Sequence, residues 1–216
     1  MTKIVNYIVI AVILSTVFTS CDDTVEVVPK KNSGFSNPKE FLANPSVSNA
    51  VKASGIKIYD GNKPPILDGN YFAEGKISNA VGFYESFIGL SVGNEFSVSA
   101  QALLGQSEGK LNFHEKDEGV PVWGKGAYIT GNNENFTIYL EIKQSGLVLE
   151  LPDDVLANMV FLVSGNRSSN GDLTAKWMWV ITNIAGTTDK YDSMEFGDIG
   201  SWYMTEGSWE KELIEY

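Results

Sequence analysis

Few residues of this chain belong to the types that carry out nucleophilic, redox or metal chemistry. Cys, His and Arg each occur once, as Cys21, His114 and Arg167. To act as a general base, His114 would need a neighbouring nucleophile and an orienting carboxylate. It lies in a polar stretch, and we expect a solvated loop histidine. A single Cys excludes an internal disulfide, a Cys-rich zinc site and a C-x-x-C redox pair.

Carboxylates are the other candidates for chemistry. Acidic residues recur at every third position in one segment, as Asp189, Asp192, Glu195 and Asp198. Their oxygens are suited to Ca²⁺, but the spacing does not match an EF-hand, and a solvated acidic loop is the simpler interpretation. Glycoside hydrolysis needs two facing carboxylates, and nothing in the sequence pairs Glu74, Glu141 or Glu150. The sequence therefore predicts no enzyme, no cofactor and no metal.

Cys21 follows a segment with the features of a secretory signal peptide. Lys3 gives this segment a positive start, residues 4–20 carry no charge, and residues 8–14 are continuously apolar. The run is shorter than the ~20 apolar residues that a transmembrane helix needs, so we expect a cleaved signal. Phe18-Thr19-Ser20-Cys21 resembles the site cut by lipoprotein signal peptidase. The resemblance implies that residues 1–20 are removed and that Cys21 carries the lipid anchor, with fatty acyl chains such as palmitate.

Two acidic residues, Asp22 and Asp23, come directly after the Cys. They are similar to the acidic residues that follow the lipidated Cys in surface lipoproteins of Bacteroidota, where they act as an export signal. The resemblance implies a lipid-anchored protein of the cell outer membrane, exposed at the cell surface. In enterobacterial lipoproteins an Asp at this place implies retention at the inner membrane, so a periplasmic location stays open.

The charge balance limits the partners of the chain. It has 27 acidic and 16 basic residues and a formal charge of −11. Nucleic acid needs a basic face, and anionic lipid surfaces attract Lys and Arg, so neither is an expected partner. The lipid on Cys21, and not surface charge, would hold the protein on a membrane. We expect a flexible tether over residues 21–36 and a single β-rich domain over residues 37–216.

Hydrophobic periodicity indicates an all-β domain behind a short helix. Asn37 is suited to cap a helix, and Gly55 to end it. From Ile56 onward apolar and polar residues alternate, most clearly in residues 136–143 and 173–182. A turn at 144–146 predicts a hairpin with the Leu residues at 147, 149 and 151, and residues 200–205 predict a last strand. Eight to ten strands joined by short turns favour an up-and-down antiparallel β-barrel, with a β-sandwich as the alternative.

One stretch resembles a known group of proteins. Residues 59–71 read Tyr-Asp-Gly-Asn-Lys-Pro-Pro-Ile-Leu-Asp-Gly-Asn-Tyr. This stretch resembles the opening of lipocalin-like lipoproteins of unknown function from Bacteroidota, in which a Pro-Pro turn precedes a Gly-x-aromatic start to the first long strand. Tyr71 stands where lipocalins have the Trp of Gly-x-Trp. The resemblance implies a lipocalin-like barrel.

Aromatic side chains are the strongest candidates for binding. They make up 12% of the chain, and the candidates are Tyr71, Phe136, Tyr139, Trp177 and Trp179. Pointing into a barrel, they would line a pocket for a small apolar or amphipathic ligand. On an exposed sheet face they would instead serve a glycan-binding or protein-interaction module. A third interpretation is ordinary core filling. The sequence thus predicts a membrane-anchored, non-catalytic binding protein, with the interaction module as the alternative.

Overall fold

The computed structural model describes residue 35 and residues 37–104, 108–114, 123–124, 127–145, 156–185 and 198–212. All of them belong to one compact unit, Ser33–Tyr216. The predicted lipidation and export residues Cys21, Asp22 and Asp23 lie outside the described residues, as do Asp189, Asp192 and Glu195.

Two short helices open this unit, and asparagine caps explain where they begin. Asn37 caps α2 (Pro38–Ala43), and Asn44 caps α3 (Pro45–Ser54); each side chain accepts hydrogen bonds from two backbone N–H groups of the first turn. Gly55 ends α3 in the left-handed conformation, with φ 68°. The predicted N-terminal helical segment is confirmed, as a pair of helices. None of the described helices combines the length and the apolar character needed to cross a membrane.

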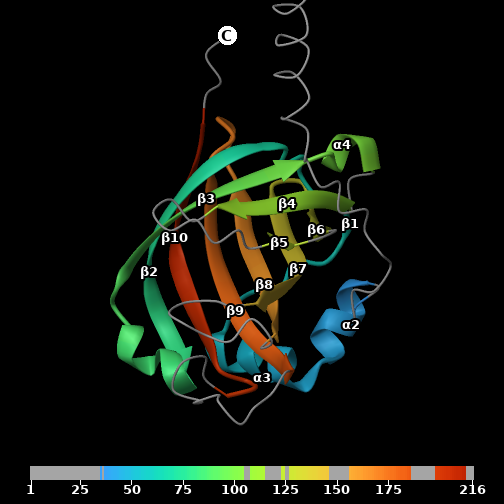
Figure 1. Cartoon of the computed structure of the whole chain (residues 1–216). Coiled ribbons are helices and arrows are strands. Elements are labelled where there is room, and N and C mark those ends of the chain that lie inside the picture. The colour runs from blue at the N-terminus through green and yellow to red at the C-terminus, as the bar shows by residue number, and fades with distance from the viewer. Residues whose placement is uncertain are drawn as a thin grey trace, which may run out of the picture. The chain divides into compact units, whose positions relative to one another are not determined.

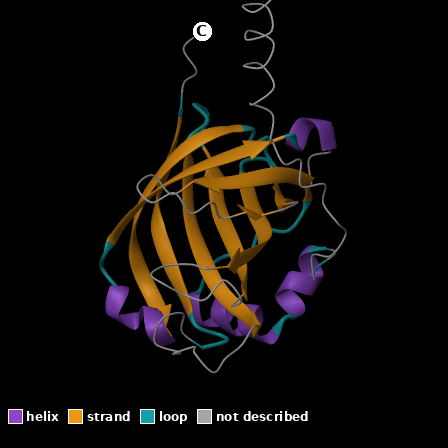
Figure 2. Cartoon of the chain, in the orientation of Figure 1, coloured by secondary structure: helices purple, strands orange, loops and turns teal. Residues whose placement is uncertain are grey.

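Strands make up most of the remaining described residues, drawn in orange in Figure 2. They are β1 (Asn62–Lys63), β2 (Gly69–Val81), β3 (Ser91–Ser99), β4 (Glu108–His114), β5 (Trp123–Gly124), β6 (Ala127–Asn132), β7 (Asn135–Ser145), β8 (Leu156–Arg167), β9 (Leu173–Ala185) and β10 (Trp202–Lys211). The helical turn η1 (Gly82–Phe87) links β2 to β3, and α4 (Gln101–Leu104) follows β3 (Figure 1). The predicted all-β class is confirmed.

The described strands form one sheet, in the order β1-β6-β4-β3-β2-β10-β9-β8-β7-β5, and β6 also pairs with β7. β1 runs parallel to β6, and the other pairs are antiparallel. A β-sandwich, the alternative expectation, would need two sheets.

Two strand boundaries differ from the prediction. β7 continues through residues 144–145, which pair with Ala157 and Leu156 of β8. The predicted turn therefore does not begin at Gln144, because the ladder with β8 extends the strand across a turn-like Gln-Ser sequence, and the predicted partner residues 147–151 lie outside the described residues. The last strand runs to Lys211 and does not stop at Thr205, since residues 206–211 pair with both β2 and, in part, β9.

Each face of the sheet carries an apolar layer. The outer layer lies over β7–β10 and is covered by α2 and α3 through Phe41, Val47 and Ala50. The inner layer is on the opposite face and takes the alternate residues of the same strands. β8 contributes to both layers, with Phe161 inside and Leu162 outside, which explains why its residues 159–163 are continuously apolar.

Candidate binding site

The inner layer centres on a continuous set of aromatic rings. Trp209 stacks on Phe96 with ring centroids 4.2 Å apart and meets Trp177 edge-on at 5.8 Å. Phe161 also stacks on Phe96, at 5.6 Å, and lies 4.3 Å from Trp179. Such aromatic pairs contribute about 0.5–1.5 kcal/mol each beyond the area they bury. The rings therefore join strands β3, β8, β9 and β10 through the middle of the layer.

Four of the five predicted ligand-binding residues lie together in the inner layer. They are Tyr71, Phe136, Trp177 and Trp179, and all four are buried. Trp177 and Trp179 share this face because they are two positions apart on β9. They therefore do not form an exposed aromatic platform.

Tyr139 is separated from the other four candidates. It is three positions from Phe136 on β7 and so points to the outer layer, where its ring centroid is 5.8 Å from that of Phe41. Burial raises the pKa of the Tyr139 hydroxyl, and a side-chain hydrogen bond with Thr130 acts in the opposite direction. Tyr139 therefore takes part in the packing of helix α2 on the sheet.

Within the described part of the chain, Nε of Arg167, which is opposite Leu173 in the β8–β9 ladder, has no hydrogen-bond partner, and neither do three polar atoms in the middle of the inner layer. These three atoms are Nε1 of Trp177, Nε1 of Trp209 and Oγ1 of Thr205, and their residues are 0% exposed. Thr205 lies opposite Trp177 in the β10–β9 ladder, and Trp209 follows four residues later on the same face. Leaving a buried polar group unpaired costs about 1–3 kcal/mol, so native proteins almost always satisfy it. The hydrogen bonding of the inner layer is therefore incomplete at this place.

Glycines form the wall beside these groups. Gly75 and Gly207 are opposite each other in the β2–β10 ladder. A Cβ on Gly75 would lie 2.8 Å from Cη2 of Trp177 and 2.6 Å from the carbonyl oxygen of Glu206. The Trp177 indole thus occupies space that any side chain at position 75 would need.

Half-buried side chains form a rim at one end of the inner layer. The rim residues are Tyr84, Val92, Ile184 and Tyr203, which pack against the layer from η1, the start of β3, the end of β9 and the start of β10. The Tyr84 and Tyr203 rings meet edge-on at 4.9 Å. Next to the rim, Ile88 and Leu90 are 50% and 53% exposed. This end of the layer is apolar and reaches solvent.

The opposite end is fastened by hydrogen bonds. The Tyr71 hydroxyl donates to the carbonyl oxygen of Leu67 at 2.7 Å, and Oε1 of Gln101 accepts from the Leu67 N–H at 2.7 Å. Lys211 Nζ donates to the carbonyl oxygen of Asp68 at 3.0 Å. Burial raises the pKa of Tyr71 to about 12, although the positive charge of Arg167 acts to lower it. Polar contacts therefore hold the Gly69-Asn70-Tyr71 segment in place.

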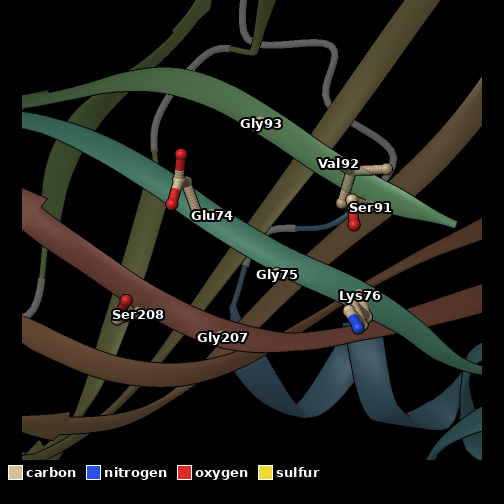
Figure 3. A pocket seen from close by; sticks show the side chains of 8 residues that line it. All are labelled: Glu74, Gly75, Lys76, Ser91, Val92, Gly93, Gly207 and Ser208. Carbon is tan, nitrogen blue, oxygen red and sulfur yellow. The ribbon is translucent and has the colours of Figure 1, made fainter. Parts of the chain in front are cut away.

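A solvent-open groove crosses β10, β2 and β3 (Figure 3). Its volume is about 480 Å³, and it is lined by Glu74, Gly75, Lys76, Ser91, Val92, Gly93, Gly207 and Ser208. Polar side chains and glycines make up most of this lining, and none of the described lining residues is aromatic. The described lining therefore offers no stacking surface for a sugar ring.

The residues considered for catalysis are not brought together. Glu74 is exposed on β2 and Glu141 is half-buried on β7, two strands that do not pair, and Glu150 lies outside the described residues. The backbone of His114 ends β4. Among the described residues no group of three or more His, Cys, Asp and Glu side chains is placed to hold a metal ion.

The sequence also holds two Gly-x-Ser-x-Gly segments, at residues 89–93 and 105–109. In hydrolases such a segment forms a sharp turn from a strand into a helix, with the Ser at its tip. Ser91 is instead the first residue of β3 and faces solvent, and Ser107 lies outside the described residues. Ser91 therefore lacks the setting of a hydrolase nucleophile.

Several residues of the inner site were not predicted from the sequence, namely Gly75, Phe96, Phe161, Thr205 and Trp209. Trp209 has a signal, because it alternates with the exposed Ser208 and Glu210. Thr205 has none, since a threonine in a strand is most often a surface residue.

Comparisons with known proteins add no relative. A scan against protein-family models, a search of curated proteins and a search of solved structures each found no match to this chain. The function proposed below therefore rests on the residues and the geometry of this chain alone.

Proposed function

We propose that this chain is a non-catalytic binding protein whose inner layer holds a small apolar or amphipathic ligand. The observation that carries the proposal is the half-buried rim of Tyr84, Val92, Ile184 and Tyr203 at one end of a buried aromatic layer. Ligand sites are typically concave and lined by apolar and aromatic side chains with a few polar groups. The rim would give such a ligand a route to Trp179 and its neighbours.

The proposal includes closure of the sheet into a lipocalin-like, up-and-down antiparallel barrel. In its support, each of eight described strands, β2, β3, β4 and β6 to β10, has two antiparallel neighbours. Closure would leave these strands without a free edge. Barrels of about eight strands have an interior that side chains fill or that holds one small ligand.

The proposal also places the protein at a membrane through a lipid on Cys21, in the outer membrane and exposed at the cell surface. Two features of the sequence support a lipid anchor, the signal-like segment before Cys21 and the Asp22-Asp23 pair after it. The net charge of −11 adds support, because anionic lipid does not attract a negatively charged domain. We expect Cys21→Ser to move the protein from the membrane fraction to the soluble fraction. Protease treatment of intact cells then separates the two locations, because a protein that faces the periplasm survives it.

The ligand proposal is tested with N-phenyl-1-naphthylamine, a neutral probe that becomes fluorescent in apolar sites. We expect saturable binding to the purified protein, and a loss of binding in Val92→Trp, which would fill the rim. Leu103→Trp is the control, because it adds the same indole at an exposed position on α4, away from the rim. No saturable binding to the unmodified protein would refute the ligand proposal.

A second candidate function is a protein-interaction module, and the surface around η1 favours it. Val81, Ile88, Leu90 and Ile199 are 43–54% exposed, and the first three flank η1 in the sequence. Exposed apolar patches mark interaction sites when they are contiguous. Under this alternative, Ile88→Ser with Leu90→Ser would abolish a partner contact and leave probe binding unchanged. Loss of probe binding in this double variant would instead assign the surface to ligand access.

A further inference from the structure

The polar atoms of the inner layer suggest which ligand the site takes. We infer that Trp177, Trp209 and Thr205 form a subsite for a neutral hydrogen-bond acceptor, such as a ketone, ester, amide or ether oxygen on an otherwise apolar molecule. This inference rests on the proposed binding function and specifies its ligand.

The missing partner must be an acceptor. An indole N–H can only donate, so the two tryptophans offer two donors and no acceptor. Neither donor, nor the Thr205 hydroxyl, has a partner among the described residues. A single carbonyl or ether oxygen has two lone pairs and can accept from two donors at once. The edge-on contact of the Trp177 and Trp209 rings at 5.8 Å keeps the two indoles close to each other.

The acceptor must also be neutral. The described buried members of the inner layer are apolar, and the only buried polar side chains on its strand positions are Asn94 and Thr205. A carboxylate placed beside Trp177 would find no cation there, and burying an unpaired charge is far more costly than burying a neutral polar group.

Arg167 lies on the same face of the sheet at the fastened end, beside Tyr71, whose ring centroid is 6.1 Å from that of Trp209. The Nε atom of Arg167 is buried and has no hydrogen-bond partner among the described residues. The sulfonate probe below therefore tests neutrality, because an anion paired with this guanidinium would bind more tightly than the neutral probes and would overturn the neutral acceptor.

Aromatic rings provide the apolar part of the site. Phe96 stacks on Trp209, and Phe161 and Trp179 continue the row of ring contacts from Phe96. A ligand that fits both parts has a flat or elongated apolar body and one oxygen acceptor at its inner end. An alternative partner is a trapped water, which would satisfy the same atoms without any ligand.

Three naphthalene probes distinguish these cases. Prodan carries a neutral ketone, N-phenyl-1-naphthylamine lacks an oxygen acceptor, and anilinonaphthalene sulfonate carries an anion. We expect the protein to bind prodan most tightly and the sulfonate most weakly. Thr205→Val should weaken prodan binding about fivefold, the equivalent of one hydrogen bond, and leave N-phenyl-1-naphthylamine unchanged. The matched control is Thr174→Val, at an exposed position on β9.

The indole N–H signals in ¹H–¹⁵N NMR spectra give a second measurement that does not depend on a variant. Prodan should shift the signals of Trp177 and Trp209, whereas Trp202, which lies in the outer layer, should not respond. Equal effects of Thr205→Val on both neutral probes, or unshifted Trp177 and Trp209 signals with prodan bound, would overturn the acceptor subsite and favour a trapped water. Absence of binding by both neutral probes would refute the binding function itself.

Discussion

Two hydroxyl groups in the outer layer are hydrogen-bonded, whereas three polar groups in the middle of the inner layer have no partner among the described residues. In the outer layer, Oγ1 of Thr137 accepts from the Tyr59 N–H at 2.8 Å and lies 3.1 Å from Oγ of Ser164, which in turn donates to the carbonyl oxygen of Lys57. In the inner layer, Trp177, Trp209 and Thr205 form no comparable chain.

Under the proposed function, this difference separates groups that hold the fold together from groups that contact a ligand. A hydrogen-bonded hydroxyl gains nothing from a further molecule, while an unpaired donor is stabilised by one that supplies an acceptor. The outer layer therefore serves to hold α2, α3 and residues 56–60 on the sheet. The inner layer is where a ligand would add to the stability of the protein.

Removing an outer aromatic ring should have the largest effect on stability and the smallest on binding. Phe41 is buried, stacked on Phe35 at 4.5 Å and tilted against Tyr139. Phe41→Ala should lower the free energy of unfolding by about 3 kcal/mol, measured by chemical denaturation, because it leaves a cavity. Probe affinity should stay the same wherever the variant is folded. Phe41→Leu is the control and should lose less; a loss of probe affinity would show that the layers are not independent.

Gly207 on β10 and Gly93 on β3 differ in the space that a Cβ atom would have. A Cβ on Gly207 would overlap the carbonyl oxygen of Glu74, which is backbone and cannot turn away, whereas a Cβ on Gly93 would have its nearest neighbour at 3.6 Å. Gly207→Ala should therefore cost about 2–3 kcal/mol of stability, and Gly93→Ala close to nothing. Thermal unfolding of the two variants side by side is the measurement. Equal melting temperatures would mean that β2 and β10 do not approach as closely as described.

Thr137 and Thr205 form a matched pair that tests the difference between the outer and the inner layer. Thr137→Val removes a hydroxyl that accepts from Tyr59 and should lower the free energy of unfolding by about 1–2 kcal/mol. Thr205→Val removes a hydroxyl without a partner, so the ligand-free protein should keep or gain stability. Denaturation curves of both variants without ligand decide the matter. A large loss of unfolding free energy in Thr205→Val would contradict this expectation, because it would show that the Thr205 hydroxyl has a hydrogen-bond partner.

Tyr71 differs from the other polar groups of the inner layer, because its hydroxyl is hydrogen-bonded to the carbonyl oxygen of Leu67. Tyr71→Phe should cost about 1 kcal/mol at neutral pH through loss of the bond to Leu67. Burial raises the pKa of Tyr71 from 10.0 to about 12, so the unfolded chain loses this proton first and stability falls as the pH rises from 10 toward 12. Stability curves at alkaline pH should be flatter in Tyr71→Phe. Parallel curves would contradict the burial of this hydroxyl.

Local patterns were enough to predict the faces of the best strands. Alternation along β7 and β9 grouped Phe136 with Ile138 and Trp177 with Trp179, and the capping types of Asn37 and Gly55 located the helical segment. These features depend on neighbours within a few residues, which a sequence shows directly. The segment ending in Tyr71 also opened a long strand, as expected.

The pairing of strands that are far apart in the sequence could not be predicted from local patterns. The opposition of Gly75 and Gly207 depends on a register set partly by an irregularity between Met204 and Thr205, which shifts the β10–β2 pairing by one residue. Residues 206–211 contain Glu, Gly and Ser and so look like a turn, which concealed Trp209. The unpaired state of Thr205 follows only from the whole inner layer, so the polar part of the site had no signal in the sequence.

The position of α2 and α3 at the start of the described unit has a mechanical consequence. Tension applied through the chain from residues before Phe35 reaches the contacts of Phe41 and Val47 before it reaches any strand. Those contacts are side-chain packing and yield one at a time, whereas the β8–β9 ladder would have to break along many hydrogen bonds. Such tension would thus detach the two helices first, and the aromatic inner layer would stay assembled.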